Sequence, residues 1–393
     1  MTLIPIHEAQ MRLLAAVQPV EAENVPLTQA HGRWAADDVL AQRTQPATDL
    51  SAMDGYAIRF DDLPGPWTLI GESAAGRPLT GIVAPGETAR IFTGAALPAG
   101  ADTVMIQEEV EADGATIRLT GEGPAHQGRN TRRRGLDFMH GDRLIARGER
   151  LTPARIAVAA TGGLADVRVG RRVRVAICAT GDELVEPGAG SDAMALPESN
   201  RAMIAAMLAD LPVDIVDMGI LPDDLDALRD AFARVEADLL VTTGGASVGD
   251  HDLVRPALEA AGGTIDFWRI ALRPGKPMMA GRLGGTMVLG LPGNPVSAFV
   301  TAMLFVKPLI AHCGGAAEPL PRPTLALLGE DLPANGPRTD YLRAELRDGH
   351  AYASTIQDSS MLLTLARSHC LILRPADAPP AKAGDSAEIL VIA

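Results

Sequence analysis

The feature that most constrains the fold is an alternation of short apolar runs and amphipathic stretches between residues 171 and 315. Runs of strand length are separated by stretches whose apolar residues recur at helical spacing. The strand candidates are residues 173–179, 214–220, 238–243 and 286–291, and helix candidates begin at Ser199 and cover residues 223–235. This rhythm predicts a mostly parallel sheet with helices on both faces.

Two glycine-rich loops follow strand candidates of this region, T-T-G-G-A-S-V-G-D-H-D at 242–252 and G-L-P-G-N-P at 290–295. In open parallel sheets, ligands bind outside the carboxyl ends of the strands. The first loop offers hydroxyl groups and a backbone that a ligand can approach closely, through Thr243, Gly244, Gly245 and Ser247. It is neither a Walker A loop nor G-x-G-x-x-G, so those routes to nucleotide binding are not supported.

In the second loop, Asn294 and Pro295 occupy the N-cap and first positions of a long apolar helix. The unpaired N–H groups of a helix start attract anions, whereas the simpler alternative is a well-capped turn without a ligand. The turn R-P-G-K-P at 273–277 adds two cations, Arg273 and Lys276. An exposed basic turn is the alternative interpretation there.

Carboxylates accompany these loops: Asp54, Asp182, Glu183, Asp223, Asp224, Asp250 and Asp252. Each has a simpler interpretation as a turn or cap residue, with Asp223 as the N-cap of the helix that follows. Carboxylates beside phosphate-binding groups are compatible when Mg²⁺ lies between them, because Mg²⁺ is held by few protein oxygens together with phosphates. The pattern therefore favours a ligand made of phosphate plus metal.

The rest of the chain is organised differently. An amphipathic helix is expected over residues 6–18, and a further helix over residues 152–161. Short apolar stretches separated by Gly, Pro and Asp predict a mostly β insert, which closes with four arginines within residues 129–134. We therefore predict a multidomain α/β protein with an N-terminal linking domain (1–42 and 141–170), a β insert (43–140), an α/β domain (171–315) and a small C-terminal β domain (316–393).

Composition excludes several classes of protein. The formal net charge of −14 argues against a general nucleic-acid binder. Cys178, Cys313 and Cys370 are far apart in the sequence, which favours buried thiols in a reducing compartment. Neither a signal peptide nor an uninterrupted apolar run of about 18 residues is evident. We expect a cytoplasmic protein without a membrane span.

Taken in order, the motifs resemble those of the molybdopterin molybdenumtransferases of molybdenum cofactor biosynthesis, a family homologous to the C-terminal domain of gephyrin. The matching stretches are S-A-M-D-G-Y-A (51–57), R-I-F-T-G-A (90–95), A-G-A-D-T-V-M-I-Q-E (99–108), R-R-R-G-L-D (132–137), T-G-D-E-L (180–184), T-G-G-A-S-V-G (243–249) with Asp252, R-P-G-K-P (273–277) and G-L-P-G-N-P (290–295). They span most of the chain, and their combination is specific although no single motif is.

The resemblance implies that molybdate is inserted into adenylylated molybdopterin with release of AMP, assisted by Mg²⁺. It implies a homodimer of four-domain subunits, with a C-terminal β-barrel and contacts to other enzymes of the pathway. The active cleft would lie between the α/β domain of one subunit and the insert of the other.

The resemblance also assigns roles to residues. The catalytic residues would be Asp54, Glu183, Asp252 and Lys276, and the metal ligands Asp252, Glu183 and Asp223. The residues that bind substrate would be Thr93, Thr243, Gly244, Gly245, Ser247, Arg273, Pro292, Gly293, Asn294 and Pro295. The family more often has lysine where this chain has Arg273.

Three other functions compete with a transferase. A scaffold of the gephyrin type uses the same fold, but this chain retains Asp54, Glu183, Asp252 and Lys276. A nucleotide pyrophosphatase is not expected to carry S-A-M-D-G-Y-A or the arginine run. A protein that binds molybdopterin without turnover would share many of the same groups.

Overall fold

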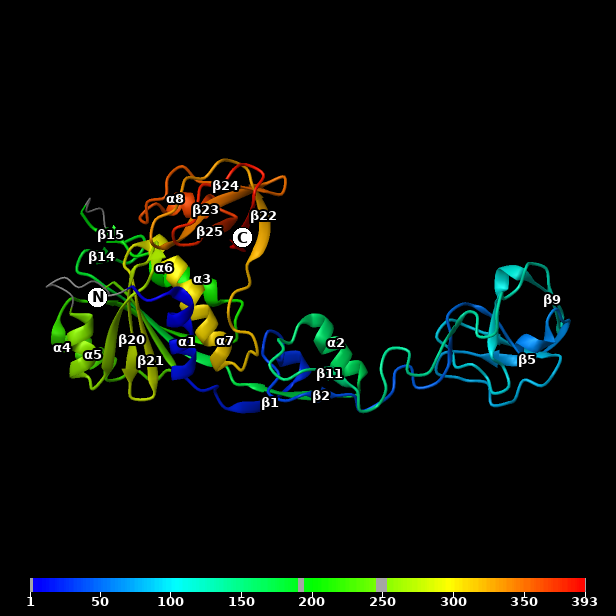
Figure 1. Cartoon of the computed structure of the whole chain (residues 1–393). Coiled ribbons are helices and arrows are strands. Elements are labelled where there is room, and N and C mark those ends of the chain that lie inside the picture. Colours follow the sequence, from blue (N-terminus) through cyan, green and yellow to red (C-terminus); the bar gives the residue numbers. More distant parts are fainter. Residues whose placement is uncertain (1–2, 190–193, 245–252, 393) are drawn as a thin grey trace. The chain divides into compact units, whose positions relative to one another are not determined.

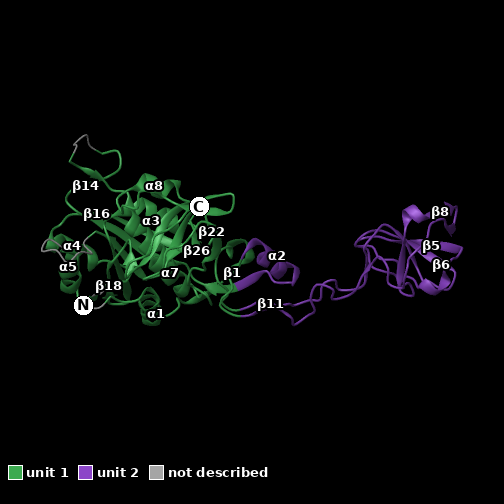
Figure 2. Ribbon diagram, turned by 45° about the horizontal axis from the view of Figure 1, so that its top comes forward, with its two compact units in different colours: residues 1–37, 147–151, 168–393 green, residues 38–146, 152–167 purple. Residues whose placement is uncertain are grey.

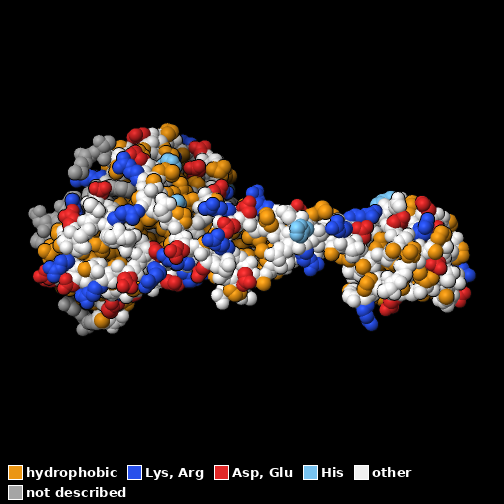
Figure 3. Space-filling model, turned by 90° about the horizontal axis from the view of Figure 1, so that it is seen from below, with side chains coloured by type: hydrophobic (Ala, Val, Ile, Leu, Met, Phe, Trp, Pro, Cys, Tyr) orange, Lys and Arg blue, Asp and Glu red, His pale blue; other side chains and the backbone are white. Residues whose placement is uncertain are grey.

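The computed structural model describes residues 3–189, 194–244 and 253–392. The chain divides into two compact units (Figure 2). Unit 1 comprises residues 1–37, 147–151 and 168–393, and unit 2 comprises residues 38–146 and 152–167. On the face of unit 1 shown in Figure 3, acidic and basic side chains are interspersed, so this face carries no single-sign field.

A six-stranded sheet organises unit 1, in the order β16-β13-β17-β21-β20-β18. Its first four strands are parallel, whereas β20 runs antiparallel to both of its neighbours, β21 and β18. The strands are β13 (Val173–Thr180), β16 (Val213–Leu221), β17 (Leu239–Thr243), β18 (Thr264–Arg269), β20 (Pro277–Leu283) and β21 (Thr286–Leu291). The mostly parallel sheet predicted from the alternating pattern is confirmed.

Helices cover both faces of this sheet (Figure 1). Side chains of Val175 and Ile177 join one core cluster, and those of Ala176 and Cys178 join the other, because successive strand residues point to opposite faces. The helices over the first face are α1 (Ile6–Ala16), α3 (Asn200–Leu208), α6 (Pro295–Thr301) and α7 (Lys307–Cys313), and those over the second are α4 (Leu225–Phe232) and α5 (Val254–Ala260).

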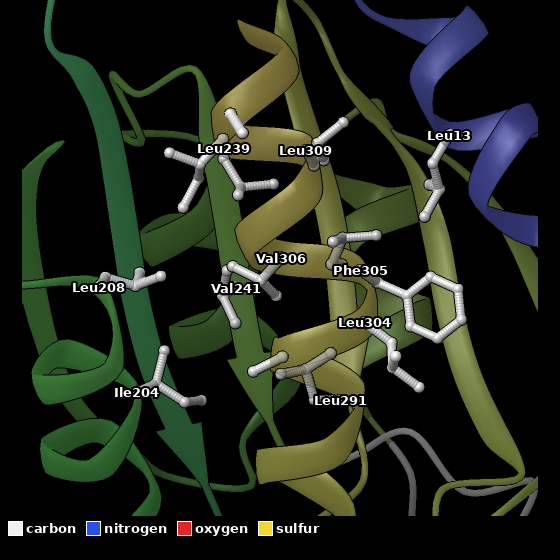
Figure 4. Packing of buried hydrophobic residues seen from close by; sticks show 14 of the residues in the cluster. Leu13, Ile204, Leu208, Leu239, Val241, Leu291, Leu304, Phe305, Val306 and Leu309 are labelled. Atoms are coloured by element: carbon white, nitrogen blue, oxygen red, sulfur yellow. The ribbon is translucent and has the colours of Figure 1, made fainter. Parts of the chain in front are cut away.

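A five-residue π-helical stretch, Ala302–Val306, joins α6 to α7 into one apolar helix. Its side chains, among them Leu304, Phe305 and Leu309, pack against the sheet and against Leu13 of α1 (Figure 4). Among the described residues this helix alone is long and apolar enough to cross a membrane, yet 78% of it is buried inside the protein. It is therefore the central helix of the core of unit 1.

The C-terminal region forms a closed barrel, as the family resemblance implied. Its strands follow the order β23-β24-β22-β26-β25, and β25 pairs with β23 to close it. The elements are β22 (Thr324–Leu328), β23 (Thr339–Arg347), β24 (His350–Ala353), α8 (Leu362–Arg367), β25 (Cys370–Arg374) and β26 (Ser386–Val391). The short β19 (Leu272–Arg273) pairs in parallel with the start of β23, so the turn that follows β19 is fixed to the barrel.

Unit 2 is built on a six-stranded sheet in the order β7-β4-β6-β5-β9-β8. Its strands are β4 (Gly55–Ile58), β5 (Trp67–Ser73), β6 (Glu87–Ile91), β7 (Thr103–Ile106), β8 (Val110–Asp113) and β9 (Thr116–Leu119). The predicted β character is thus confirmed. The unit also holds β2 (Val39–Leu40), β3 (Leu50–Ser51), β10 (Thr131–Arg132), β11 (Arg143–Ile145) and α2 (Pro153–Thr161).

Smaller elements complete the chain. They are β1 (Ala22–Pro26), β12 (Asp166–Gly170), β14 (Leu184–Val185), β15 (Leu196–Pro197) and three 3₁₀ turns at Leu27–Gln29, Phe60–Asp62 and Gln107–Glu109. The parallel pair β14–β15 lies next to α3, and it becomes important for the site.

Two predicted helix caps are corrected by the structure. Asp223 does not cap α4, because the side chain of Asp224 accepts the hydrogen bond from the Ala227 N–H. Ser199 stands at the N-cap position of α3 but makes no capping side-chain hydrogen bond. The carboxylate of Glu198 instead accepts hydrogen bonds from the N–H groups that follow Ser199. In both cases an acidic neighbour competes successfully for the free N–H groups at the helix start.

Candidate functional site

The site lies where the parallel strands of unit 1 end. Register pairs Thr180 with Leu221, Ala179 with Thr243, and Thr243 with Leu291, so these strands end at one edge of the sheet. Because β20 runs antiparallel to β21, its first residue, Pro277, reaches the same edge. The turn R-P-G-K therefore approaches the ends of the glycine loops, although it precedes its strand of this sheet, β20, whereas the glycine loops follow theirs.

A cavity of about 740 Å³ opens at this edge. Seven of the residues predicted from the sequence line it, namely Glu183, Thr243, Gly244, Pro292, Gly293, Asn294 and Pro295. Ten lining residues were not predicted, namely Thr180, Leu184, Leu196, Pro197, Glu198, Ser199, Asn200, Pro277, Ser360 and Leu362. Its lining combines prolines and leucines with eight polar or charged residues, and such a mixture of apolar walls and polar groups is typical of small-molecule sites.

Gly244 is required where the first loop leaves its strand. Its φ of +88° is unfavourable for other residues, and a Cβ there would lie 2.5 Å from the carbonyl oxygen of Thr180. A Cβ on Gly293 would lie 3.6 Å from the Cα of Gly244. The two glycine loops therefore pack backbone against backbone at the cavity wall.

The start of the long helix is only partly available to a ligand. Asn294 and Pro295 occupy the predicted N-cap and first positions, but the Asn294 side chain donates to the Ser359 hydroxyl at 3.0 Å instead of capping the helix. The Val296 N–H, which we expected to be unpaired, donates to the Ser359 carbonyl oxygen at 3.0 Å. Ser359, a residue of the C-terminal region, therefore already accepts a hydrogen bond from one of the N–H groups that we expected to bind an anion.

Two buried polar atoms at the cavity lack a hydrogen-bond partner among the described residues. They are Oγ1 of Thr243, a residue that is 1% exposed, and Oδ1 of Asn200, which is 8% exposed. Buried polar atoms in native proteins are normally paired, with protein or with ordered water or ligand. These atoms are therefore candidates for contact with a bound molecule.

Three carboxylates gather at the end of β13 and β16. The Asp223 N–H donates to Oδ1 of Asp182 at 3.0 Å. Partial burial, and then the negative charges of Asp182 and Glu183, raise the pKa of Asp223. Such a cluster of oxygens suits a hard cation, because a bound Mg²⁺ would offset the mutual repulsion.

The metal site predicted at Glu183, Asp223 and Asp252 is only partly visible. Among the residues that the structure describes, no three His, Cys, Asp or Glu side chains lie close enough to hold a metal ion. Asp252 lies outside those residues, as do Gly245 and Ser247. The visible carboxylates fit a cation that also takes oxygen ligands from elsewhere, as Mg²⁺ commonly does.

The two cations of R-P-G-K differ in their surroundings. Arg273 forms an ion pair with Asp340, a barrel residue whose side chain is only 4% exposed. Lys276 is exposed and lies immediately before Pro277 at the cavity. Lys276 is therefore more accessible to an incoming anion than Arg273.

In unit 2, the structure brings Asp54 and Thr93 together. Oδ1 of Asp54 accepts hydrogen bonds from the backbone N–H and the hydroxyl of Thr93, both at 2.7 Å. These bonds lower the pKa of Asp54, so its carboxylate is charged at neutral pH. Both residues were predicted from the sequence as site residues, but the hydrogen bonds between them were not.

The unpredicted lining residues come mainly from two places. The stretch S-N-R at 199–201 was predicted only as the start of a helix. This helix start lies at the carboxyl edge of a parallel sheet, where ligands bind, so the stretch could also have been predicted to line a site. That position was an available signal for Asn200. No comparable signal existed for Ser360 and Leu362, because their position depends on how the barrel packs against α6.

The raised pKa of Asp223 leads to a testable expectation. A raised carboxyl pKa means that the ionised form destabilises the native state once the pH exceeds that pKa. Asp223→Asn should therefore be at least as stable as the wild type at pH 7 in denaturant titrations. The difference should shrink as the pH falls through the raised pKa of Asp223, and it should be gone near the ordinary carboxyl value of about 4.

Asp223→Asn should also weaken Mg²⁺ binding, measured by calorimetry, because it removes one of the mutually repelling negative charges that a bound Mg²⁺ would neutralise. In the wild type, Mg²⁺ affinity should rise with pH as Asp223 loses its proton. Asp226→Asn, an exposed change in the same segment, is the control and should leave Mg²⁺ binding unchanged. Equal Mg²⁺ affinities for Asp223→Asn and wild type would remove Asp223 from the metal site.

Family models match nearly the whole chain. They are the MoeA N-terminal region (domain I and II) at residues 4–163, a probable molybdopterin binding domain at residues 176–312, and the MoeA C-terminal region (domain IV) at residues 326–392. The crystal structure of the molybdopterin biosynthesis moeA protein from Pyrococcus horikoshii OT3 is similar to the chain with a TM-score of 0.85 at 28% identity, and both chains are covered in full.

Curated relatives are similar over their full length. The molybdopterin molybdenumtransferase of Haemophilus influenzae is 34% identical over 399 residues, which cover 98% of each chain. That of Staphylococcus aureus (strain COL) is 31% identical over 405 residues, covering 99% of this chain and 95% of the relative. With motifs, fold and full-length similarity in agreement, the chain belongs to the molybdopterin molybdenumtransferase (MoeA) family.

Proposed function

We propose that this protein is a molybdopterin molybdenumtransferase, which inserts molybdate into adenylylated molybdopterin and releases AMP. The observation that carries the proposal is the cavity at the carboxyl edge of the parallel sheet. It combines apolar side chains, two buried polar atoms that have no hydrogen-bond partner in the described part of the chain, and the carboxylate of Glu183, in a protein whose relatives bear this name. A ligand with a flat ring system and a phosphate linkage would use all three features.

Different residues of the chain would bind different parts of the substrate. The proline and leucine walls would hold the rings, while the Thr243 hydroxyl and the loop containing Gly244 would contact the phosphates. Lys276, exposed at the rim, would attract the phosphates or the molybdate dianion as a mobile point charge. Arg273 would act as a second anion-binding residue while still paired with Asp340.

Glu183, Asp223 and Asp252 would hold Mg²⁺. When bound, Mg²⁺ would neutralise phosphate charge and polarise the phosphoanhydride that links AMP to molybdopterin. The acidic side chains would otherwise repel the substrate, so their presence beside a phosphate site is consistent with a metal-dependent reaction.

We further propose a homodimer with a composite active site, in a cytoplasmic protein that exchanges substrate with other enzymes of the pathway. Asp54 and Thr93 of one subunit would face the cleft of the other subunit. The hydrogen bonds from Thr93 hold the Asp54 carboxylate charged and oriented, which suits a residue that positions molybdate or metal.

The direct test is release of AMP. Purified protein given adenylylated molybdopterin and Mg²⁺ should release AMP when molybdate is added, as followed by chromatography of the nucleotide. Omitting molybdate is the control. Tight binding without AMP release would contradict the transferase and favour a non-catalytic binding or scaffolding protein of the gephyrin type.

The role of Lys276 can be tested by removing its charge. Lys276→Gln should bind adenylylated molybdopterin several-fold more weakly, and this difference should narrow at high salt, because ionic screening already weakens the wild-type contact. Lys382→Gln, which removes a charge from the barrel surface where Lys382 pairs with Asp331, is the matched control. An unchanged affinity in Lys276→Gln would exclude the phosphate role.

Mixed dimers test the composite site. Asp54→Ala and Asp252→Ala should each abolish AMP release in homodimers. A heterodimer of the two variants should regain up to half of the wild-type activity, because one of its two clefts would be intact. If heterodimers stay inactive while remaining dimeric, Asp54 and Asp252 belong to the cleft of one subunit.

A further inference from the structure

Asn200 has a buried side-chain amide at the cavity, and the proposed reaction assigns no role to this amide. It is the first residue of α3, it is 8% exposed, and it lines the cavity with Thr243 and Gly293. The segment before it, from Leu196 to Ser199, also lines the cavity. Asn200 thus contributes a buried amide to a wall that combines apolar side chains with other polar ones, among them Glu183, Thr243 and Asn294.

The orientation of this amide is determined by its neighbour. Nδ2 of Asn200 donates a hydrogen bond of 2.8 Å to the carbonyl oxygen of Gly293, an atom that can only accept. Oδ1 must therefore point away from Gly293, and among the described residues it has no donor. An oxygen that is fixed, buried and unpaired among the described residues is expected to receive a donor from water or from a bound molecule, and a molecule in the cavity can supply that donor.

A network of charges also holds Asn200 in place. Its N–H donates to Oε1 of Glu198 at 2.6 Å, and Glu198 accepts in turn from the guanidinium of Arg201. Arg201 is 7% exposed and also pairs with Glu186 and Asp217. Because these contacts fix the first turn of α3, Oδ1 is preorganised for its partner.

The walls around the cavity indicate the shape of that partner. Their apolar part is formed by four prolines and three leucines, namely Pro197, Pro277, Pro292, Pro295, Leu184, Leu196 and Leu362. Rigid apolar side chains suit the faces of a flat ring, and a buried acceptor suits an N–H donor on its edge. A phosphate has no such donor at neutral pH, so Oδ1 is not a phosphate ligand.

We propose that Asn200 is a recognition residue whose Oδ1 accepts a hydrogen bond from the exocyclic amine of a planar nitrogen heterocycle. The proposal rests on the proposed function, whose substrate carries two such rings, a pterin and an adenine. Both supply the same donor chemistry. The experiment therefore has an arm for each ring.

A cycle that removes one partner at a time tests the contact. Wild type and Asn200→Ala are titrated by calorimetry with AMP and with purine riboside 5′-monophosphate, which lacks the amine. A second arm uses pterin and 2-desaminopterin. For the ring that binds at Asn200, removing the amine should weaken binding to wild type by about tenfold and hardly affect binding to Asn200→Ala.

The cycle separates recognition from a structural role. Asn200→Ala also loses the bond to Gly293, but that loss weakens binding of both members of a ligand pair equally. Coupling in the AMP arm assigns the adenine to Asn200, and coupling in the pterin arm assigns the pterin. Absence of coupling in both arms overturns the proposal.

Asn335→Ala is the matched control, because the Asn335 side chain also donates to backbone carbonyls but belongs to the barrel. It should leave all four affinities unchanged. AMP release is measured on the same preparations of wild type. Release without coupling would refute only the role of Asn200, whereas coupling without release would refute only the transferase.

Discussion

The site depends above all on the backbone register of the parallel strands. Hydrogen bonding between β16, β13, β17 and β21 makes them end together, so loops from distant parts of the sequence converge. Gly244 and Gly293 then allow two of these loops to touch through their backbones. Because main-chain contacts set this geometry, side chains at the edge are free to carry chemistry instead of structure.

A second constraint is the buried guanidinium of Arg201, which joins three parts of unit 1. It pairs with Glu186 after β14, with Glu198 before α3, and with Asp217 in β16. Partial burial alone would raise the pKa of Asp217, but hydrogen bonds from the Gly219 N–H and from Arg201 lower it. Loss of Arg201 would leave the carboxylate of Glu198, which is 3% exposed, without its counter-charge, and this is costly, so the cluster fixes the cavity wall.

Sequence patterns anticipated the elements better than the contacts between them. Periodicity located the four parallel strands of the unit 1 sheet and helices α1, α3, α4 and α6, because burial on one or both faces leaves a pattern in the local sequence. It did not locate β18, β20 or α5. The N-cap of α4 was predicted at Asp223, one residue too early. Asp223 and Asp224 are the same residue type, so only the folded structure distinguishes them. Ser359 and Asp340 could not be related to Val296 and Arg273, because those contacts form only when the barrel packs on the α/β domain.

The acidic groups at the edge also have a consequence for stability. Asp182, Glu183 and Asp223 repel one another, and partial burial adds to the cost, as the raised pKa of Asp223 indicates. A fold optimised for stability alone would not retain this cluster, since exchanging one carboxylate for an amide would relieve it. Local strain that persists against an easy remedy is typical of functional sites. The same reasoning applies to Oδ1 of Asn200, which is buried without a donor among the described residues. The proposed cation and ring amine would offset both costs, so the edge would be adapted to its complex more than to the free protein.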